Sequence, residues 1–146
     1  MRESFGGAFM LKLVLIFIII YVSFMAMAIT YAKAFRVKNG VIDILERYQY
    51  EGASDYGSVE EPLETYLNAI PYHERSDSTV NYCDKEAKKE GKTYVVNSNG
   101  VCIIDMSTNN EYGYYKVITY ISIKDFPFFD INVIFPISGE TKTIYY

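Results

Sequence analysis

The stretch LVLIFIIIYVSFMAMAITYA, from Leu13 to Ala32, decides the fold because its 20 residues carry no charge. Lys12 precedes it and Lys33 follows it. A helix of this length rises about 30 Å at roughly 1.5 Å per residue, which matches the hydrocarbon layer of a bilayer. We therefore predict a transmembrane helix, with the lipid bilayer as its partner.

This stretch has two other interpretations. A buried core helix is disfavoured because the rest of the chain is too short to enclose it on every face. A cleaved secretory signal is the second alternative, since Ala26-Met27-Ala28 loosely matches the small-residue cleavage pattern. The apolar region of such signals is usually about 7–15 residues long, which is shorter than this span. Cleavage near Ala28 stays open as an alternative.

The helical pattern continues beyond the apolar span. Apolar residues recur at three- and four-residue intervals, at Phe35, Val37, Val41, Ile42, Ile44, Leu45 and Tyr48. We predict one helix from about Phe9 to Tyr48, with Gly40 as its weak point or kink because glycine is a poor helix former.

The chain then divides into four segments. Residues 1–12 form a short tail or leader, 13–32 the transmembrane helix and 33–50 its amphipathic continuation. Residues 51–146 are left for a single extracytoplasmic domain.

Composition and charge narrow the function classes. The 146 residues are 50% apolar and 16% aromatic, so the chain should fold rather than stay disordered. With 14 Lys and Arg against 18 Asp and Glu, the net charge is −4, which argues against a surface for nucleic acid.

The sequence predicts no enzyme. It contains no G-x-S-x-G motif and no phosphate-binding glycine loop. Its single histidine, His73, has no partner at metal-ligand spacing, and we expect it at the surface. We therefore expect no catalytic residue, metal site or cofactor.

Cys83 and Cys102 are the only cysteines. In a secreted domain two cysteines most simply pair, and closing a loop of about 20 residues would stabilise the fold by about 3 kcal/mol. The alternative is two free thiols in a cytosolic domain. Lysine and arginine near the two ends of the span favour a cytoplasmic carboxyl side, whereas the cysteines favour an outward one, which we adopt.

Helical signals after the membrane span are few. Residues 49–62 are rich in Gly, Ser and acids and predict a linker. A short helix should begin at a Ser58–Glu61 capping box or at Pro62, bury Leu63, Leu67 and Ile70, and end at Pro71. Residues 72–92 are polar and predict a solvated loop or helix end.

The last third predicts antiparallel strands. A hairpin should join 93–96 to 101–106 around the turn 97–100, and a second turn at 107–111 should lead into a strand at 114–124. One face of that strand should pack against a helix while the other stays mixed. We predict an irregular apolar loop at 126–136, because of its two prolines, and a final strand at 137–145. The fold class is α+β: a long amino-terminal helix on a meander of three to four strands.

This layout is similar to type IV pilins and pseudopilins. The helix entry RESFGGAF (Arg2–Phe9), its exit AKAFRVKN (Ala32–Asn39) and the close FPISGETKTIY (Phe135–Tyr145) resemble a TadE-like pseudopilin, a minor component of bacterial tight-adherence pilus systems.

The resemblance implies a structural role. A prepilin peptidase would cut after Gly7 and leave Ala8 as the mature terminus, and the partners would be other pilin-like subunits. The fifth mature residue would then be Lys12, where the family typically carries Glu. The implied location is the cell membrane, with a single span, an outward carboxyl domain and use in a surface pilus. The alternative is a membrane-tethered binding or accessory module that does not polymerise.

Overall fold

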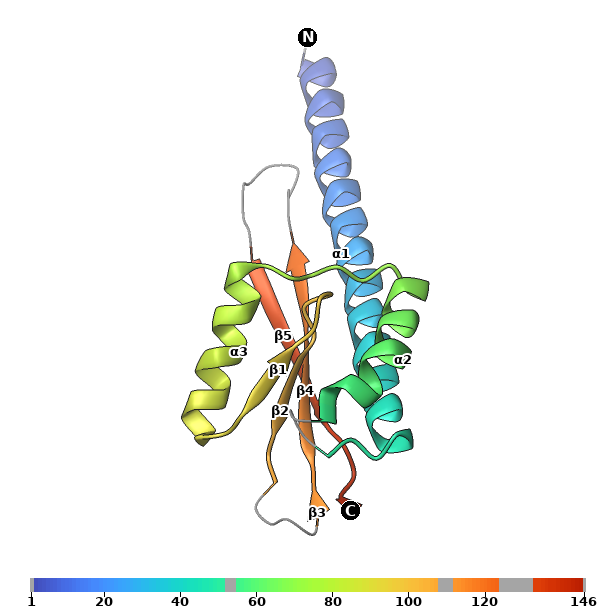
Figure 1. Ribbon diagram of the computed structural model, residues 1–146. Coiled ribbons are helices and arrows are strands. Elements are labelled where there is room, and N and C mark those ends of the chain that lie inside the picture. The colour runs from blue at the N-terminus through green and yellow to red at the C-terminus, as the bar shows by residue number, and fades with distance from the viewer. Residues whose placement is uncertain (1, 52–54, 108–111, 124–132, 146) are drawn as a thin grey trace.

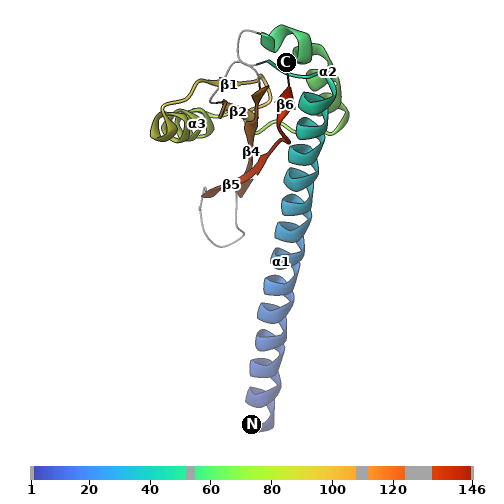
Figure 2. The ribbon, with the colours of Figure 1, turned by 90° about the horizontal axis from the view of Figure 1, so that it is seen from below.

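The computed structural model describes residues 2–51, 55–107, 112–123 and 133–145. It is an α+β fold in which one long helix continues from a small domain into open space (Figures 1 and 2). The fold class expected from the sequence, a long amino-terminal helix on an antiparallel sheet, is confirmed.

Helix α1 spans Arg2–Arg47 without interruption. Its second half buries Ala34, Val37, Val41 and Leu45, which lie three or four residues apart and so share one face. The expected continuity of the helix is confirmed. A break at Gly40 is not observed, because this glycine instead makes room for a side chain from the next helix.

Helix α2 spans Tyr56–Ala69, so it begins earlier than the sequence suggested. Its buried stripe is Val59, Leu63 and Leu67, at i, i+4 and i+8. Because Val59 extends this stripe by one turn, the predicted linker is shorter and Ser58 does not cap the helix. Ser58 instead donates to the carbonyl of Asp55, 2.9 Å away.

Helix α3 spans Asp77–Glu90, where the sequence suggested only a loop or a helix end. Ser76 caps it by accepting from the amide of Thr79, and Gly91 ends it in the left-handed conformation at φ 63°. Its buried face consists of Thr79, Cys83 and Ala87. None of these is a large apolar residue, so the stripe carried little hydrophobic signal.

The main sheet has the strand order β1-β2-β4-β5, and every neighbouring pair is antiparallel. Its strands are β1 (Tyr94–Val96), β2 (Cys102–Asp105), β4 (Tyr115–Ile123) and β5 (Val133–Glu140). The predicted hairpin around residues 97–100 is confirmed. A separate two-stranded sheet pairs β3 (Tyr112–Gly113) with β6 (Ile144–Tyr145).

Both faces of the sheet are covered. Strand β4 directs Tyr115 and Val117 into the core formed by α1 and α2, and it directs Ile118 and Tyr120 into the core under α3. Figure 2 shows α3 on one side of the sheet and α1 with α2 on the other. The second face is mixed in composition, as expected, since it carries Lys116 and Ser122 beside Ile118 and Tyr120. The sequence did not indicate that α3 covers this face.

The end of the chain departs from the sequence prediction in two ways. Strand β5 begins at Val133 and continues through Pro136, which the sequence placed in a loop. Because β5 is an edge strand, a proline there loses no ladder hydrogen bond when its nitrogen faces outward. The predicted strand 137–145 is divided between β5, which ends at Glu140, and β6, which begins at Ile144. At Thr141 the side-chain hydroxyl, in place of the main-chain carbonyl, accepts from the Tyr115 amide. Most of the predicted turn at 107–111, and residues 126–132 of the predicted loop, lie outside the described residues.

Candidate membrane-anchoring and assembly site

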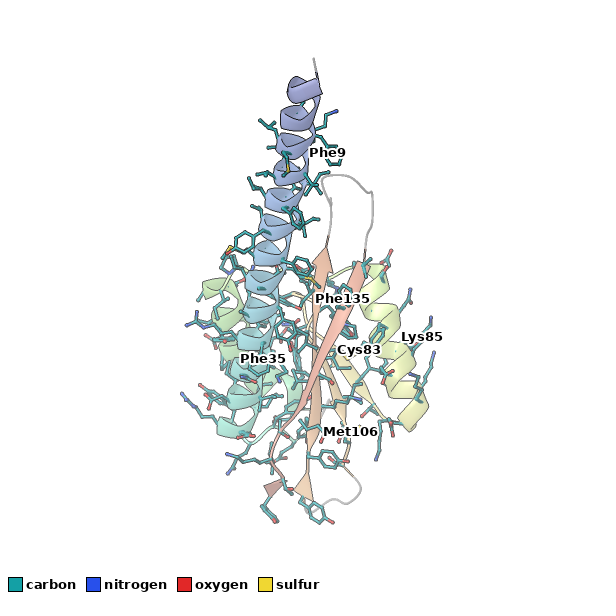
Figure 3. The ribbon with its side chains drawn as sticks, turned by 180° about the vertical axis from the view of Figure 1, so that it is seen from behind. Phe9, Phe35, Cys83, Lys85, Met106 and Phe135 are labelled. Atoms are coloured by element: carbon teal, nitrogen blue, oxygen red, sulfur yellow. A yellow bond between two sulfur atoms is a disulfide. The ribbon has the colours of Figure 1, made fainter. Side chains whose placement is uncertain are left out.

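The first half of α1 presents a continuous apolar surface. Every described large apolar side chain from Phe9 to Ile29 is at least 36% exposed, and the most apolar part of the helix has none of its residues buried. Figure 3 shows these side chains, Phe9 among them, projecting around the helix beyond the domain. By length and composition α1 can cross a membrane.

Three polar contacts fasten the second half of α1 where it enters the domain. The Lys33 ammonium donates to the Pro71 carbonyl, the Thr119 hydroxyl donates to the Ala34 carbonyl at 3.1 Å, and the Tyr66 hydroxyl donates to the Arg36 carbonyl at 3.1 Å. These contacts begin directly after the apolar span. The domain therefore adjoins the span with no intervening stalk.

Two close approaches add to this attachment. A Cβ atom built at Gly40 would lie 2.0 Å from the Tyr66 hydroxyl. The Tyr66 ring therefore occupies the space beside Gly40, its seat on α1, which only a residue without a side chain leaves free. Lys38 is 8% exposed, although it is charged. Its ammonium lies 4.2 Å from the centre of the Phe35 ring, and its stem packs against Gly139 of β5.

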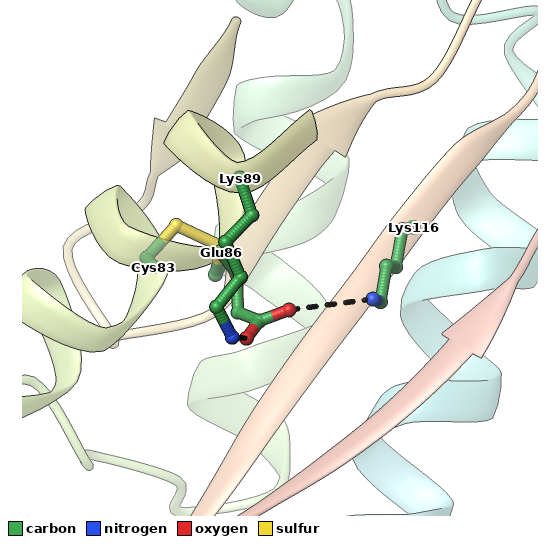
Figure 4. A network of polar contacts seen from close by, with 5 residues as sticks. Cys83, Glu86, Lys89 and Lys116 are labelled. Carbon is green, nitrogen blue, oxygen red and sulfur yellow. Dashed lines mark hydrogen bonds and ion pairs between the residues drawn. A yellow bond between two sulfur atoms is a disulfide. The ribbon is translucent and has the colours of Figure 1, made fainter. Parts of the chain in front are cut away.

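The predicted disulfide is present and fastens α3 to the sheet. Cys83 of α3 and Cys102 of β2 are both fully buried, and their Cα atoms lie 5.9 Å apart. Beside it, Glu86 accepts from Lys89 and forms a 3.7 Å ion pair with Lys116 of β4 (Figure 4). These two lysines, Lys89 foremost through its hydrogen bond, hold the pKa of the Glu86 carboxyl below its usual value.

Tyr72 supplies hydrogen bonds to the backbone of β4 beyond the point where its neighbour β2 has ended. The Tyr72 hydroxyl donates to the Tyr120 carbonyl and accepts from the Tyr120 amide, at 3.2 and 2.8 Å. Burial raises the pKa of the Tyr72 phenol, so it stays protonated as this double role requires. Both backbone groups of Tyr120 thus point away from β5. Its β5 partner Pro136 therefore occupies a position without ladder hydrogen bonds.

The candidate cleavage residues lie on the exposed first turns of α1. A Cβ atom placed on Gly6 or Gly7 would meet nothing within 4 Å, and Ala8 is exposed. Two adjacent glycines make this turn a weak part of the helix, since each costs about 1 kcal/mol relative to alanine. Lys12 lies about one turn further on. His73 is exposed, two residues after Pro71, whose carbonyl accepts from Lys33.

No family model matches the chain, and neither the curated proteins nor the solved structures include a match to it.

The two halves of α1 have different surroundings. The exposed half of α1 is suited to lipid or to other helices, and the buried half is part of the domain core. Sequence reasoning identified both halves but missed the residues that join them, Tyr66 and Thr119, because their partners are backbone atoms distant in the sequence.

Proposed function

We propose that the protein is a pilin-like structural subunit, anchored by a single membrane span and used in the assembly of a tight-adherence type pilus. The observation that carries the proposal is the division of α1. Its apolar first half lies fully outside the domain, while its second half supplies Val37, Val41 and Leu45 to the core. A helix of this kind can be stored in a bilayer and can later pack against other helices without any change in the domain.

The outward location of the domain is part of the same proposal. The buried disulfide between Cys83 and Cys102 supports it, because disulfides persist in oxidising compartments. A mass comparison of natively prepared protein under reducing and non-reducing conditions tests this point. Two free thiols would contradict the outward topology.

Lys12 favours one alternative function. If the chain is cut after Gly7, a basic residue occupies the fifth mature position, where pilins of this class typically carry Glu. A tethered binding or accessory module that never polymerises would have no need of that acid.

Processing distinguishes the two functions. We would determine the intact mass and the amino-terminal sequence of the protein isolated from its native membranes. The pilin-like function predicts a mature terminus at Ala8, produced by a prepilin peptidase. An intact Met1 would contradict it and favour the static anchor, and a terminus just after Ala28 would indicate a secreted domain. A Gly7→Leu variant supplies the control, since it should block a cut at this glycine while leaving the apolar span unchanged.

A further inference from the structure

The sheet lies beside α1 in a register that can be read from three contacts. The Thr119 hydroxyl of β4 reaches the Ala34 carbonyl at 3.1 Å, and Gly139, the β5 partner of Val117, packs against Lys38. Further along, the Lys142 amide donates to the Glu46 carboxylate at 2.8 Å. Ile137, the β5 partner of Thr119, and Lys142 are five residues or about 17 Å apart, while Ala34 and Glu46 are twelve helix residues or about 18 Å apart, so β4 and α1 run alongside each other in opposite directions.

Extending this register places the strand ends next to the apolar span. Ile121 and its partner Phe135 are level with about Thr30, and the last pair, Ile123 with Val133, is level with about Ala26. Ala26 is six residues inside the end of the span at Ala32, which corresponds to about 9 Å along the helix. In Figure 1 these ends of β4 and β5 lie at the same end of the domain as the first half of α1.

We propose that this end of the sheet is a second membrane contact, which lies in the boundary between the headgroups and the acyl chains beside α1. The inference rests on the proposed membrane anchoring of α1. Amphipathic elements that lie in this boundary enter it by about 5–10 Å, which is the depth that the register gives.

The exposed side chains at this level fit the boundary layer. Phe135 is 42% exposed on β5, at the end of the domain from which the first half of α1 emerges (Figure 3). Tyr31 and Phe35 of α1 are also exposed, and their rings stack with centres 6.5 Å apart. Lys33 lies between these two rings along the helix and donates to the Pro71 carbonyl, and Arg36 follows both rings on the domain side, where lipid phosphates would lie. Aromatic rings at the boundary with lysine and arginine at the headgroups are the usual order at a membrane surface.

The backbone of the edge strand fits as well. Pro136 pairs with Tyr120 and is level with about Ala32, at the margin of the span. Its nitrogen faces the open edge of β5 and carries no hydrogen. One backbone donor that lipid could not satisfy is thereby removed from the edge at this depth.

The chain contains no tryptophan, so a single introduced tryptophan reports the depth of one position without background. We would prepare the full chain as Phe135→Trp, Phe17→Trp and Tyr145→Trp in bilayers of phosphatidylcholine with a minority of phosphatidylglycerol. Phe17 lies inside the span, four residues after its start at Leu13, and Tyr145 is 72% exposed on β6 at the far end of the domain. Quenching by lipids brominated near the headgroup or near the chain end then gives the depth of each position.

The proposal predicts that Phe135→Trp emits at shorter wavelength than Tyr145→Trp and loses emission to lipids brominated near the headgroup. Emission and quenching of Phe135→Trp equal to those of Tyr145→Trp, with Phe17→Trp deeply quenched, would overturn it. In that case the span occupies the bilayer nearer to the amino terminus and the sheet stands in water. An unquenched Phe17→Trp would instead contradict the membrane anchoring itself.

Discussion

Substitution of Gly40 by alanine should destabilise the protein, although the same change stabilises most helices. Alanine in place of glycine within a helix gains about 1 kcal/mol. Here the new Cβ would lie 2.0 Å from the Tyr66 hydroxyl and 2.6 Å from its Cε1, so the ring must leave its seat. Overpacking costs about 1–3 kcal/mol, and the lost hydrogen bond from Tyr66 to the Arg36 carbonyl costs about 1 kcal/mol more. We expect a net loss of roughly 2 kcal/mol.

A double-mutant cycle makes the reasoning refutable. Urea unfolding of the full chain in detergent micelles, followed by far-ultraviolet circular dichroism, gives the free energy of each variant. In a Tyr66→Ala background the seat is empty, so Gly40→Ala should now stabilise by about 1 kcal/mol. Gly57→Ala in α2 is the matched control, since its Cβ would meet nothing within 4 Å. If Gly40→Ala stabilises with Tyr66 present, Gly40 is a weak point of the helix and the packing argument is wrong.

Three further outcomes are expected from the same unfolding assay. Tyr72→Phe removes the partner of two buried backbone groups of Tyr120 and should cost about 1–3 kcal/mol; an unchanged midpoint would contradict the bridging role. Joint substitution Cys83→Ser and Cys102→Ser should lower the free energy of unfolding by about 3 kcal/mol, and hydrogen exchange should rise first in α3. A uniform rise across the sheet would argue against a disulfide that mainly fastens α3. Glu86→Gln should cost a few tenths of a kcal/mol at pH 7, because its folded-state pKa is lowered by two lysines. This stabilisation is present above the unfolded pKa of about 4.3 and is lost as the pH falls through the lower folded pKa, so wild type and variant should converge in acid.

The parts of the fold that the sequence predicted well are those with long or distinctive patterns. The uncharged span and the apolar residues after it predicted α1, and the Asn-Gly pair at 99–100 predicted the β1–β2 hairpin. Both signals are local, because helix periodicity and a turn with left-handed backbone depend on neighbouring residues only. Cys83 and Cys102 could be paired because no other cysteine competes for either.

The parts that the sequence missed depend on partners elsewhere in the chain. The buried stripe of α3 is Thr79, Cys83 and Ala87. These side chains are small, and the helix is held on the sheet with the help of the disulfide from Cys83. Among the contacts of the candidate site, the seat of Tyr66 on Gly40 joins residues of two consecutive helices that lie 26 positions apart in the sequence. A glycine in a helix has the same local signature whether it permits a bend or a close contact. Only the tertiary structure separates these two meanings.

Pro136 has a consequence for how copies of this protein can associate. An exposed edge strand offers its free amides and carbonyls to any other strand, which is a common route to aggregation. On β5 the outward position opposite Tyr120 holds a proline, so a strand added at this edge would find a carbonyl but no donor there. At the other edge β1 contributes only three residues. Sheet extension is thus discouraged at both edges of the main sheet, so the assembly that we propose would use packing of α1 rather than a sheet edge.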